Sequence, residues 1–242
     1  MNHWLEKYDL LAFDDIGSTN DEAKNIVLST GKSNIVLWAK TQYKGRGRYD
    51  RNWVSSEGNL YMSIIKKVSC DLATASQLSF VIGLAVYDSI APLLQNKHLS
   101  LKWPNDIMIE DSKVGGILLE SVTHNNELYI IIGVGLNIQH APDKISTATS
   151  LNNHGIDVSP AYLLSSIIEK LEILIENWFT QGFQLIREKW LKSSYKLGEV
   201  VTIGSDNKRA TGIFESINEE GGIVLKIASG EKYVLSTGEV FF

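Results

Sequence analysis

The sequence predicts an α+β protein in which a mixed β-sheet domain with helices, residues 1–195, precedes a small β-barrel, residues 196–242. Two observations predict this class. Up to residue 195, stretches with apolar residues at helical spacing lie between stretches rich in β-branched and aromatic residues. After Tyr195 the pattern changes to short apolar runs separated by polar or glycine turns, which is typical of a small β-domain. The length of 242 residues fits a main domain with a small appendage.

The first predicted helix begins at a capping box and runs to about Gly31. In this box Thr19 accepts a hydrogen bond from the backbone of the first turn, and Glu22 reaches back. Two strands, residues 35–41 and 59–66, follow. The loop between these strands is therefore expected at exposed strand ends.

A long core helix is predicted over residues 74–95, because its apolar residues recur at helical spacing. The segments KVGGILLESV and ELYIIIGVGLNI flank the turn-forming residues 124–126, which predicts an antiparallel hairpin. Ser159 followed by Pro160 predicts the start of a helix that runs to about Trp178. Two further predictions complete the chain: a short helix at 183–191, and strands at 200–203, 209–217, 223–227 and 232–235.

Composition excludes several classes of protein. Hydrophobic residues make up 44% and charged residues 21% of the sequence, as in soluble globular proteins. The net charge of -5 argues against a broad basic surface for duplex nucleic acid. Cys70 is the one cysteine, so no intrachain disulfide or cysteine-based zinc site can form. No long uncharged apolar stretch and no signal sequence is found, so we expect a cytoplasmic protein without a membrane partner.

The stretch KGRGRYDRNW, residues 44–53, is the most distinctive local feature. Its two glycines allow the backbone to approach a ligand closely. Its arginines offer planar forks that suit carboxylate or phosphate, and its tryptophan offers a flat face for a purine. The alternatives are a solvated basic turn and a loop that touches RNA. The residues concerned are Gly45, Arg46, Gly47, Arg48, Arg51 and Trp53.

Two lysine motifs follow. In KWPND, residues 102–106, the proline predicts the end of a strand. Asp106 is either a turn residue or a carboxylate near a magnesium nucleotide. Lys102 is either a charge in the pocket or a charge on the surface. In KVGGIL, Lys113 precedes two glycines at the start of an apolar strand. The paired glycines fit either a bulge or a ligand that lies against bare backbone under the ammonium group.

The segment GVGLN, residues 133–137, does not match a dinucleotide fingerprint, since the third glycine and the following helix are absent. A strand with small residues on one face fits the wall of a ligand site. Asn137 at its end either pairs with an adenine edge or caps a turn. Ser18 and Thr19 could likewise offer hydroxyl groups to a ligand, although helix capping explains Thr19 by itself.

Taken together and in this order, five segments resemble the biotin protein ligase family. The resemblance covers residues 10–150, and the β-rich end of the chain resembles the small SH3-like domain that ends the family's proteins. It implies the class II synthetase-like fold of biotin and lipoyl ligases for the first domain. The segments are STN (18–20), TQYKGRGRYDRNW (41–53), KWPND (102–106), KVGGIL (113–118) and GVGLN (133–137).

The resemblance implies the reaction of a biotin–[acetyl-CoA-carboxylase] ligase, which is ATP-dependent biotinylation of a specific lysine on a biotin carrier protein. The biotin carboxylate attacks the α-phosphate of ATP, giving biotinyl-5′-AMP and pyrophosphate, and the lysine amine then attacks this mixed anhydride. Arg46, Arg48 and Lys113 are the predicted catalytic residues, because their charges offset the repulsion between the carboxylate and the phosphates.

Binding roles are also implied by the resemblance. The residues expected to bind biotin are Ser18, Thr19, Gln42, Gly45, Arg46, Gly116, Leu118 and Gly133. Those expected to bind ATP are Arg48, Arg51, Trp53, Asp106, Lys113 and Asn137, with Trp53 stacked on adenine. Asp106 is also the expected ligand of Mg²⁺, so ATP, Mg²⁺ and biotin are the expected cofactors and substrates. The loop 43–52 is expected to close over the adenylate.

The expected partner is the biotin carrier domain of a biotin-dependent carboxylase. Because STN begins at Ser18, we expect no N-terminal DNA-binding domain and no operator binding. The resemblance also allows a homodimer through a sheet edge.

Two rival functions stay open at the level of sequence. A lipoate protein ligase shares the fold and the adenylate chemistry, but it would be expected to lack the GRGR loop followed by Trp53. A non-catalytic single-stranded RNA-binding module would use the arginines of that loop with Tyr49 and Trp53 as stacking faces, and would not consume ATP.

Overall fold

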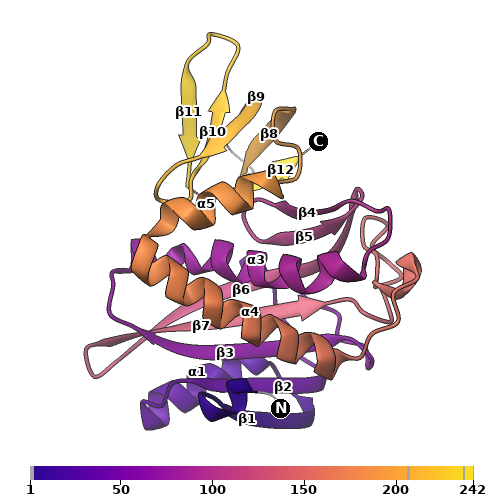
Figure 1. Cartoon of the computed structure of the whole chain (residues 1–242), viewed down its shortest axis with the longest axis vertical. Coiled ribbons are helices and arrows are strands. Elements are labelled where there is room, and N and C mark those ends of the chain that lie inside the picture. The colour runs from indigo at the N-terminus through magenta and orange to yellow at the C-terminus, as the bar shows by residue number, and fades with distance from the viewer. Residues whose placement is uncertain (1–2, 206–207, 237, 242) are drawn as a thin grey trace.

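The structure, a computed structural model, describes residues 3–205, 208–236 and 238–241. Two sheets organise the chain, a seven-stranded sheet in the order β1-β2-β3-β7-β6-β5-β4 and a five-stranded sheet in the order β11-β10-β9-β8-β12. The five-stranded sheet lies at one end of the molecule, beyond β4 and β5 (Figure 1). The prediction of an α+β protein with a β-rich C-terminal part is confirmed.

The large sheet is antiparallel except for the edge pair β1 and β2. The predicted hairpin is confirmed as the pair β6 and β7, whose turn lies at Asn125 and Asn126. The sequence analysis missed β1, because an edge strand that is mostly exposed lacks the alternating apolar pattern. The strands are β1 (Asp9–Ile16), β2 (Ile35–Gln42), β3 (Leu60–Val68), β4 (Leu99–Lys102), β5 (Asp106–Ile109), β6 (Ser112–His124) and β7 (Glu127–Leu136).

Helices cover the two faces of this sheet unequally. Alternate residues of β7 point to opposite faces: Ile130 and Ile132 join the main core with α3 and α4, whereas Tyr129 and Ile131 join a smaller core under α1. In Figure 1, α3 and α4 cross the front of the sheet. The helices are α1 (Thr19–Thr30), α2 (Leu72–Ser76), α3 (Leu78–Ile90), α4 (Pro160–Gln181) and α5 (Phe183–Lys192). The α1 face is left partly open at the end toward which β7 runs.

Two local predictions were wrong. Ser18, not Thr19, is the N-cap of α1, and its side chain accepts from the Asp21 amide at 3.4 Å. The Thr19 hydroxyl instead contacts Gln42 and Ser63, because its backbone is already helical. The long helix predicted over 74–95 is divided into α2, α3 and a 3₁₀ turn, with Gln77 between the first two.

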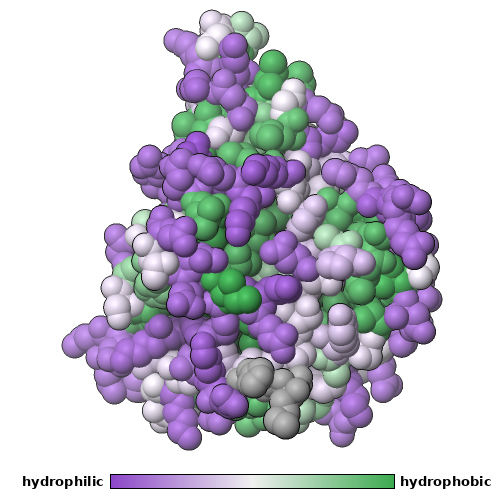
Figure 2. Space-filling model, viewed as in Figure 1, coloured by the Kyte–Doolittle hydropathy of each residue, from purple (hydrophilic) through white to green (hydrophobic). Residues whose placement is uncertain are grey.

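The segment Leu72–Leu93 has the length and hydropathy of a candidate membrane span. It contains α2 and α3, and ten residues of α3 are buried against the sheet and α4. The outer surface on this side of the molecule is largely hydrophilic, with separate hydrophobic patches between polar residues (Figure 2). Burial as a core helix accounts for the apolar composition of this segment.

The C-terminal sheet is fixed to the first by specific hydrogen bonds. The Trp103 indole donates to the Gly221 carbonyl at 2.9 Å, and the Arg187 guanidinium of α5 donates to the Ile217 carbonyl at 2.5 Å. The sequence analysis missed the last strand, β12, which pairs with β8. The strands are β8 (Val200–Ser205), β9 (Lys208–Ile217), β10 (Ile223–Lys226), β11 (Lys232–Leu235) and β12 (Glu239–Phe241).

Candidate active site

A pocket of about 350 Å³ occupies the open part of the sheet face that carries α1. Its floor comes from β3, β6 and β7, one wall is the start of α1, and the loop between β2 and β3 lies over it. β12 contributes Glu239 and Val240, so the pocket lies where the two sheets meet. Within the part of the chain that the structure describes, it is lined mainly by residues of 18–20, 46–54, 102–106, 113–118, 133–137 and 142–148.

Bare backbone forms the centre of the floor. Gly116 pairs with Gly135 across β6 and β7, and Leu118 pairs with Gly133. A Cβ on Gly135 would lie 2.6 Å from the Trp53 indole, which is closer than carbon atoms can approach. The indole therefore lies directly against the strand, and only glycine at this position leaves room for it.

The glycine-arginine loop is a hairpin that places Trp53 on this floor. The Trp53 amide donates to the Gly45 carbonyl at 2.9 Å, and the Gly47 amide donates to the Arg51 carbonyl at 2.7 Å. Gly45 is buried and lies outside the pocket lining; a Cβ there would lie 2.6 Å from the Trp53 carbonyl oxygen. This explains the glycine by loop packing, and its predicted contact with biotin stays a prediction.

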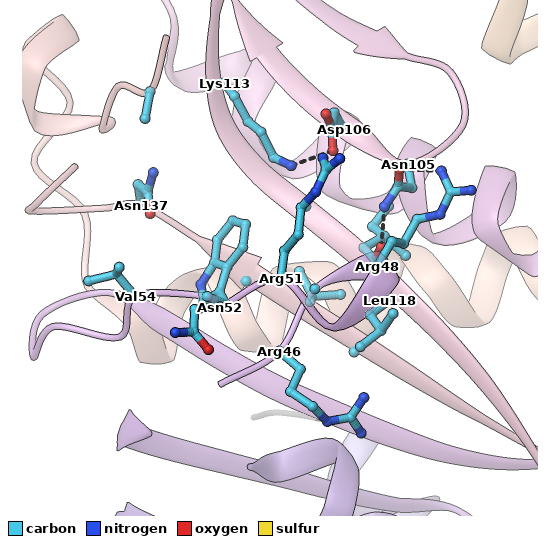
Figure 3. Close-up of a pocket in the computed structure, with 18 of the residues that line it drawn as sticks. Arg46, Arg48, Arg51, Asn52, Val54, Asn105, Asp106, Lys113, Leu118 and Asn137 are labelled. Atoms are coloured by element: carbon cyan, nitrogen blue, oxygen red, sulfur yellow. Dashed lines mark hydrogen bonds and ion pairs between the residues drawn. The ribbon is translucent and has the colours of Figure 1, made fainter. Parts of the chain in front are cut away.

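One end of the pocket is strongly cationic. The Lys113 ammonium lies 2.5 Å from the Asp106 carboxylate and 5.4 Å from the centroid of the Trp53 ring. Lys102 lines the same end, and burial lowers the pKa of its ammonium group. Figure 3 shows Lys113 and Asp106 joined by an ion pair. Positive charges this close together create a site for a polyanion.

Arg48 and Arg51 extend the cationic end and connect it to the C-terminal sheet. Arg51 makes two contacts with the Glu239 carboxylate, at 2.5 and 3.0 Å. Arg48 donates to the Gly238 carbonyl at 3.3 Å and to Asn105 Oδ1 at 3.4 Å. These are planar guanidinium groups, which can exchange a carboxylate or carbonyl partner for a phosphate.

Arg46 points in the opposite direction from Arg48 and Arg51 (Figure 3). Its guanidinium contacts Asp21 at 2.5 Å and Glu120 at 3.1 Å. The pKa of Arg46 is raised, chiefly by the hydrogen bond to Asp21. A third carboxylate, that of Asp50, lies 3.9 Å away, so the charge of Arg46 is offset by acids from α1, the loop and β6.

The other end of the pocket is neutral and more deeply buried. The Thr19 amide and hydroxyl lie 2.8 and 3.1 Å from Gln42 Oε1, and Gln42 Nε2 donates to Ser55 at 3.2 Å. Ser18 and Thr19 are each 4% exposed. Directional hydroxyl and amide groups with little charge are typical of a site that binds a neutral polar ring.

Asn137 ends β7 at the wall near Trp53. It is 3% exposed, and its Nδ2 donates to the Thr149 carbonyl at 3.0 Å, which fixes the orientation of the amide. Apolar residues that the sequence analysis missed surround this wall: Val54, Pro142, Ile145 and Ala148. For Pro142, Ile145 and Ala148, the one sequence signal for a place in the pocket was that they follow the GVGLN segment. Glu239 and Val240 gave no signal, because they lie about a hundred residues from their pocket neighbours.

A magnesium site was expected at Asp106. Among the described residues no group of three or more His, Cys, Asp or Glu side chains could hold a metal ion. Mg²⁺ with a nucleotide is usually held by phosphates, water and one or two carboxylates. A carboxylate that lines the cationic end fits that role, and Lys113 is its partner in this structure.

The structure therefore brings the predicted site residues together. Ser18, Thr19, Gln42, Arg46, Arg48, Arg51, Trp53, Asp106, Lys113, Gly116, Leu118, Gly133 and Asn137 all line one pocket, and Gly45 lies within the loop that covers it, outside the lining. Their individual roles toward biotin and ATP stay predictions.

Known proteins resemble the chain along nearly its whole length. The biotin–[acetyl-CoA-carboxylase] ligase of Paracoccus denitrificans is 33% identical over 234 residues, which cover 93% of this chain and 97% of that protein. The ligase of the same name from Mycobacterium tuberculosis is 31% identical, covering 93% of this chain and 85% of that protein. The structure of a biotin protein ligase from Aquifex aeolicus in complex with biotin and ATP matches with a TM-score of 0.81 and 27% identity, covering 96% and 97% of the two chains.

Family models match both parts of the chain. The biotin/lipoate A/B protein ligase family matches residues 12–137, and the biotin protein ligase C terminal domain matches residues 196–242. The five-stranded sheet is thus the SH3-like domain that the resemblance predicted. The family segments meet in one pocket, and the similarity extends over both sheets, so the chain belongs to the biotin protein ligases of the biotin/lipoate A/B protein ligase family.

Proposed function

We propose that this protein attaches biotin to a lysine of a biotin carrier domain in two steps, through biotinyl-5′-AMP. The observation that carries the proposal is the polarity of the pocket: a neutral, hydrogen-bonding end and a cationic end lie on either side of a bare backbone floor. Biotin has the matching polarity, with a neutral ureido ring at one end and a carboxylate at the other.

In this assignment the ureido ring lies against Ser18, Thr19 and Gln42, and the apolar body of biotin lies over Leu118 and Gly133. The carboxylate then faces the cationic end. Adenine stacks on Trp53 and hydrogen-bonds to Asn137, while the phosphates take the guanidinium groups of Arg48 and Arg51. These contacts are supported by the position of all of these residues in the lining of one pocket.

In the first step a biotin carboxylate oxygen forms a bond to the α-phosphorus of ATP, and the bond from that phosphorus to the β-bridging oxygen breaks. Pyrophosphate leaves with the electron pair. Lys113 and Arg48 offset the negative charge that increases around the α-phosphate. Arg46, which lines the same pocket, holds the carboxylate after it exchanges Asp21 or Glu120 for the substrate. Mg²⁺ bound with ATP, with Asp106 as one ligand, would supply further positive charge.

In the second step the uncharged amine of the acceptor lysine attacks the acyl carbon of biotinyl-5′-AMP. An amide bond forms, the bond from the acyl carbon to the phosphate oxygen breaks, and AMP leaves while the amine loses its proton. The loop over the pocket keeps water from the mixed anhydride until the acceptor arrives. We assign the carrier domain of a carboxylase as the acceptor and the cytoplasm as the location.

The test is pyrophosphate release from purified protein with magnesium-ATP and biotin, lipoate or no acid. Release that requires biotin supports the proposal, and transfer to a carrier domain completes it. Release with lipoate instead would make the protein a lipoate ligase. If no pyrophosphate is released with either acid, the result would contradict a ligase and favour the RNA-binding alternative. Binding of single-stranded RNA with a steep salt dependence would check that alternative.

A further inference from the structure

A row of buried and partly buried hydrogen bonds lies behind Thr19 and sets the direction in which its hydroxyl group can bond. The row runs from Glu120 on β6 through Asn20 to Ser63 on β3, and then to Thr19. Ser63 is fully buried and Asn20 is 4% exposed. In the function proposed above, Glu120 serves only as a partner that Arg46 releases, and Asn20 and Ser63 have no role.

Glu120 fixes the orientation of the Asn20 amide. The Glu120 carboxylate lies 2.8 Å from Asn20 Nδ2 and also pairs with Arg46. A carboxylate accepts and does not donate, so the NH₂ group of Asn20 must face it. The amide oxygen of Asn20 then faces Ser63. A Cβ on Gly133 would overlap the Asn20 amide, so the glycine also makes room for this orientation.

This arrangement determines which atom accepts the one hydroxyl proton of Ser63. Ser63 Oγ lies 2.6 Å from Asn20 Oδ1 and 2.7 Å from Thr19 Oγ1. Because the amide oxygen can only accept, Ser63 must donate to Asn20, and its own oxygen is left to accept from Thr19. Gln42 Oε1, 3.1 Å from the Thr19 hydroxyl, is a second acceptor, but it already accepts from the Thr19 amide at 2.8 Å. The nearer Ser63 oxygen therefore takes the Thr19 proton, and the Thr19 oxygen keeps its lone pairs for other donors.

We propose that Glu120, Asn20 and Ser63 are positioning residues that make the Thr19 hydroxyl an acceptor for an N–H group of the substrate. This inference rests on the proposed function, in which Thr19 faces the ureido ring. An accepting Thr19 hydroxyl makes the neutral end specific for acids that carry a cyclic urea or cyclic amide at the end opposite the carboxylate. A dithiolane ring has no N–H group, so it would leave the buried Thr19 oxygen unpaired, and such unpaired groups give strong discrimination.

Ser63→Ala tests the proposal, because it removes the hydroxyl group that takes the Thr19 proton. We expect the KM for biotin to rise about tenfold, with kcat and the KM for ATP changed less than about twofold. The matched control is Ser89→Ala, which removes a buried, hydrogen-bonded hydroxyl group from α3, outside the pocket. It should leave both KM values unchanged. An unchanged biotin KM in Ser63→Ala would overturn the proposal.

Selectivity between biotin and its two mono-N-methyl ureido derivatives is the second readout. Wild type should reject one derivative more strongly than the other, and this ratio should shrink about tenfold in Ser63→Ala. Glu120→Gln, which lets the Asn20 amide turn, should shrink it in the same direction. Equal use of both derivatives by wild type contradicts the proposal even if the variants do not fold.

The two proposals fail in different ways. If wild type releases no pyrophosphate with biotin, the proposed function is wrong. If wild type is active and Ser63→Ala keeps the full selectivity ratio, the function stands and the positioning role is wrong.

Discussion

The two ends of the pocket are built from opposite kinds of interaction. At the neutral end, Thr19 and Ser63 are almost entirely buried and are held by directed hydrogen bonds. At the cationic end the Arg51 side chain is 66% exposed, and its partner Glu239 comes from another sheet. Buried hydrogen bonds discriminate between ligands, because an unmatched group is left unpaired; exposed charges attract any polyanion and are screened by salt.

This difference separates selectivity from rate. The neutral end should decide which acid is used, whereas the cationic end should decide how fast the adenylate forms. If a variant at either end changed acid selectivity and the rate of adenylate formation equally, this division of roles between the two ends would be wrong. The predictions below run from the largest expected effect to the smallest.

Lys113→Ala should cause the largest loss. Removing the ammonium group leaves the negative charge of the transition state without its nearest cation, so kcat for pyrophosphate release should fall by about 100-fold or more while the fold is kept. Arg48→Ala should act in the same direction. The exposed Lys44, in the same loop as Arg48, is the control for loss of a charge. Wild-type turnover in Lys113→Ala would mean that the cationic end does not act on the chemical step.

Trp53→Ala should act mainly on nucleotide binding. The indole lies on Gly135, and in the proposed function it stacks on adenine, so its loss should raise the KM for ATP about tenfold. The biotin KM should change far less. Trp53→Phe keeps a flat face, and the indole Nε1 has no hydrogen-bond partner among the described residues, so most of the affinity should return. An ATP KM equal to that of wild type in Trp53→Ala would exclude stacking.

Glu239→Gln should have a smaller effect that depends on ionic strength. The pair with Arg51 is exposed, so its loss should lower the free energy of unfolding by less than about 1 kcal/mol. Because Glu239 repels phosphates and holds Arg51, we expect the KM for ATP to change about two- to threefold at low salt and less at high salt. Steady-state kinetics at two salt concentrations measure this. A larger change in the biotin KM than in the ATP KM would contradict the division of the pocket.

The smallest effect is expected at His154, behind Asn137. Its Nε2 lies 2.9 Å from the Thr149 hydroxyl, and burial and then Lys97 lower the pKa of the imidazole. The unfolded chain therefore takes up a proton at a higher pH than the folded protein does. The free energy of unfolding should fall as the pH drops from about 6.5 through the lowered pKa.

Thermal unfolding between pH 7.5 and 5.5 checks this, with an expected contribution to Tm of about one to three degrees. His154→Gln should lose this pH-dependent part, and the same change at the exposed His98 should keep it. A steeper acid loss in His154→Gln would show that the sign is wrong.

The sequence by itself determined the fold class, the β6–β7 hairpin and the five segments that supply most of the pocket lining, because turns, glycine pairs and cation clusters are local patterns. The binding roles of single residues came from the resemblance of those segments to a family. It failed where a role depends on neighbours distant in the chain. The capping box was assigned to Thr19, but contacts with Gln42 and Ser63 give that hydroxyl another task.

Only the tertiary structure decided the polarity of the pocket. Glu120, Asn20 and Ser63 come from β6, α1 and β3, and no sequence spacing relates them. Glu239 reaches the pocket because the C-terminal sheet packs against its end, and Arg46 pairs with acids of α1 and β6. Local patterns fix which groups are present, whereas the direction of a buried hydrogen bond depends on every group along it, and the fold is what sets those groups side by side.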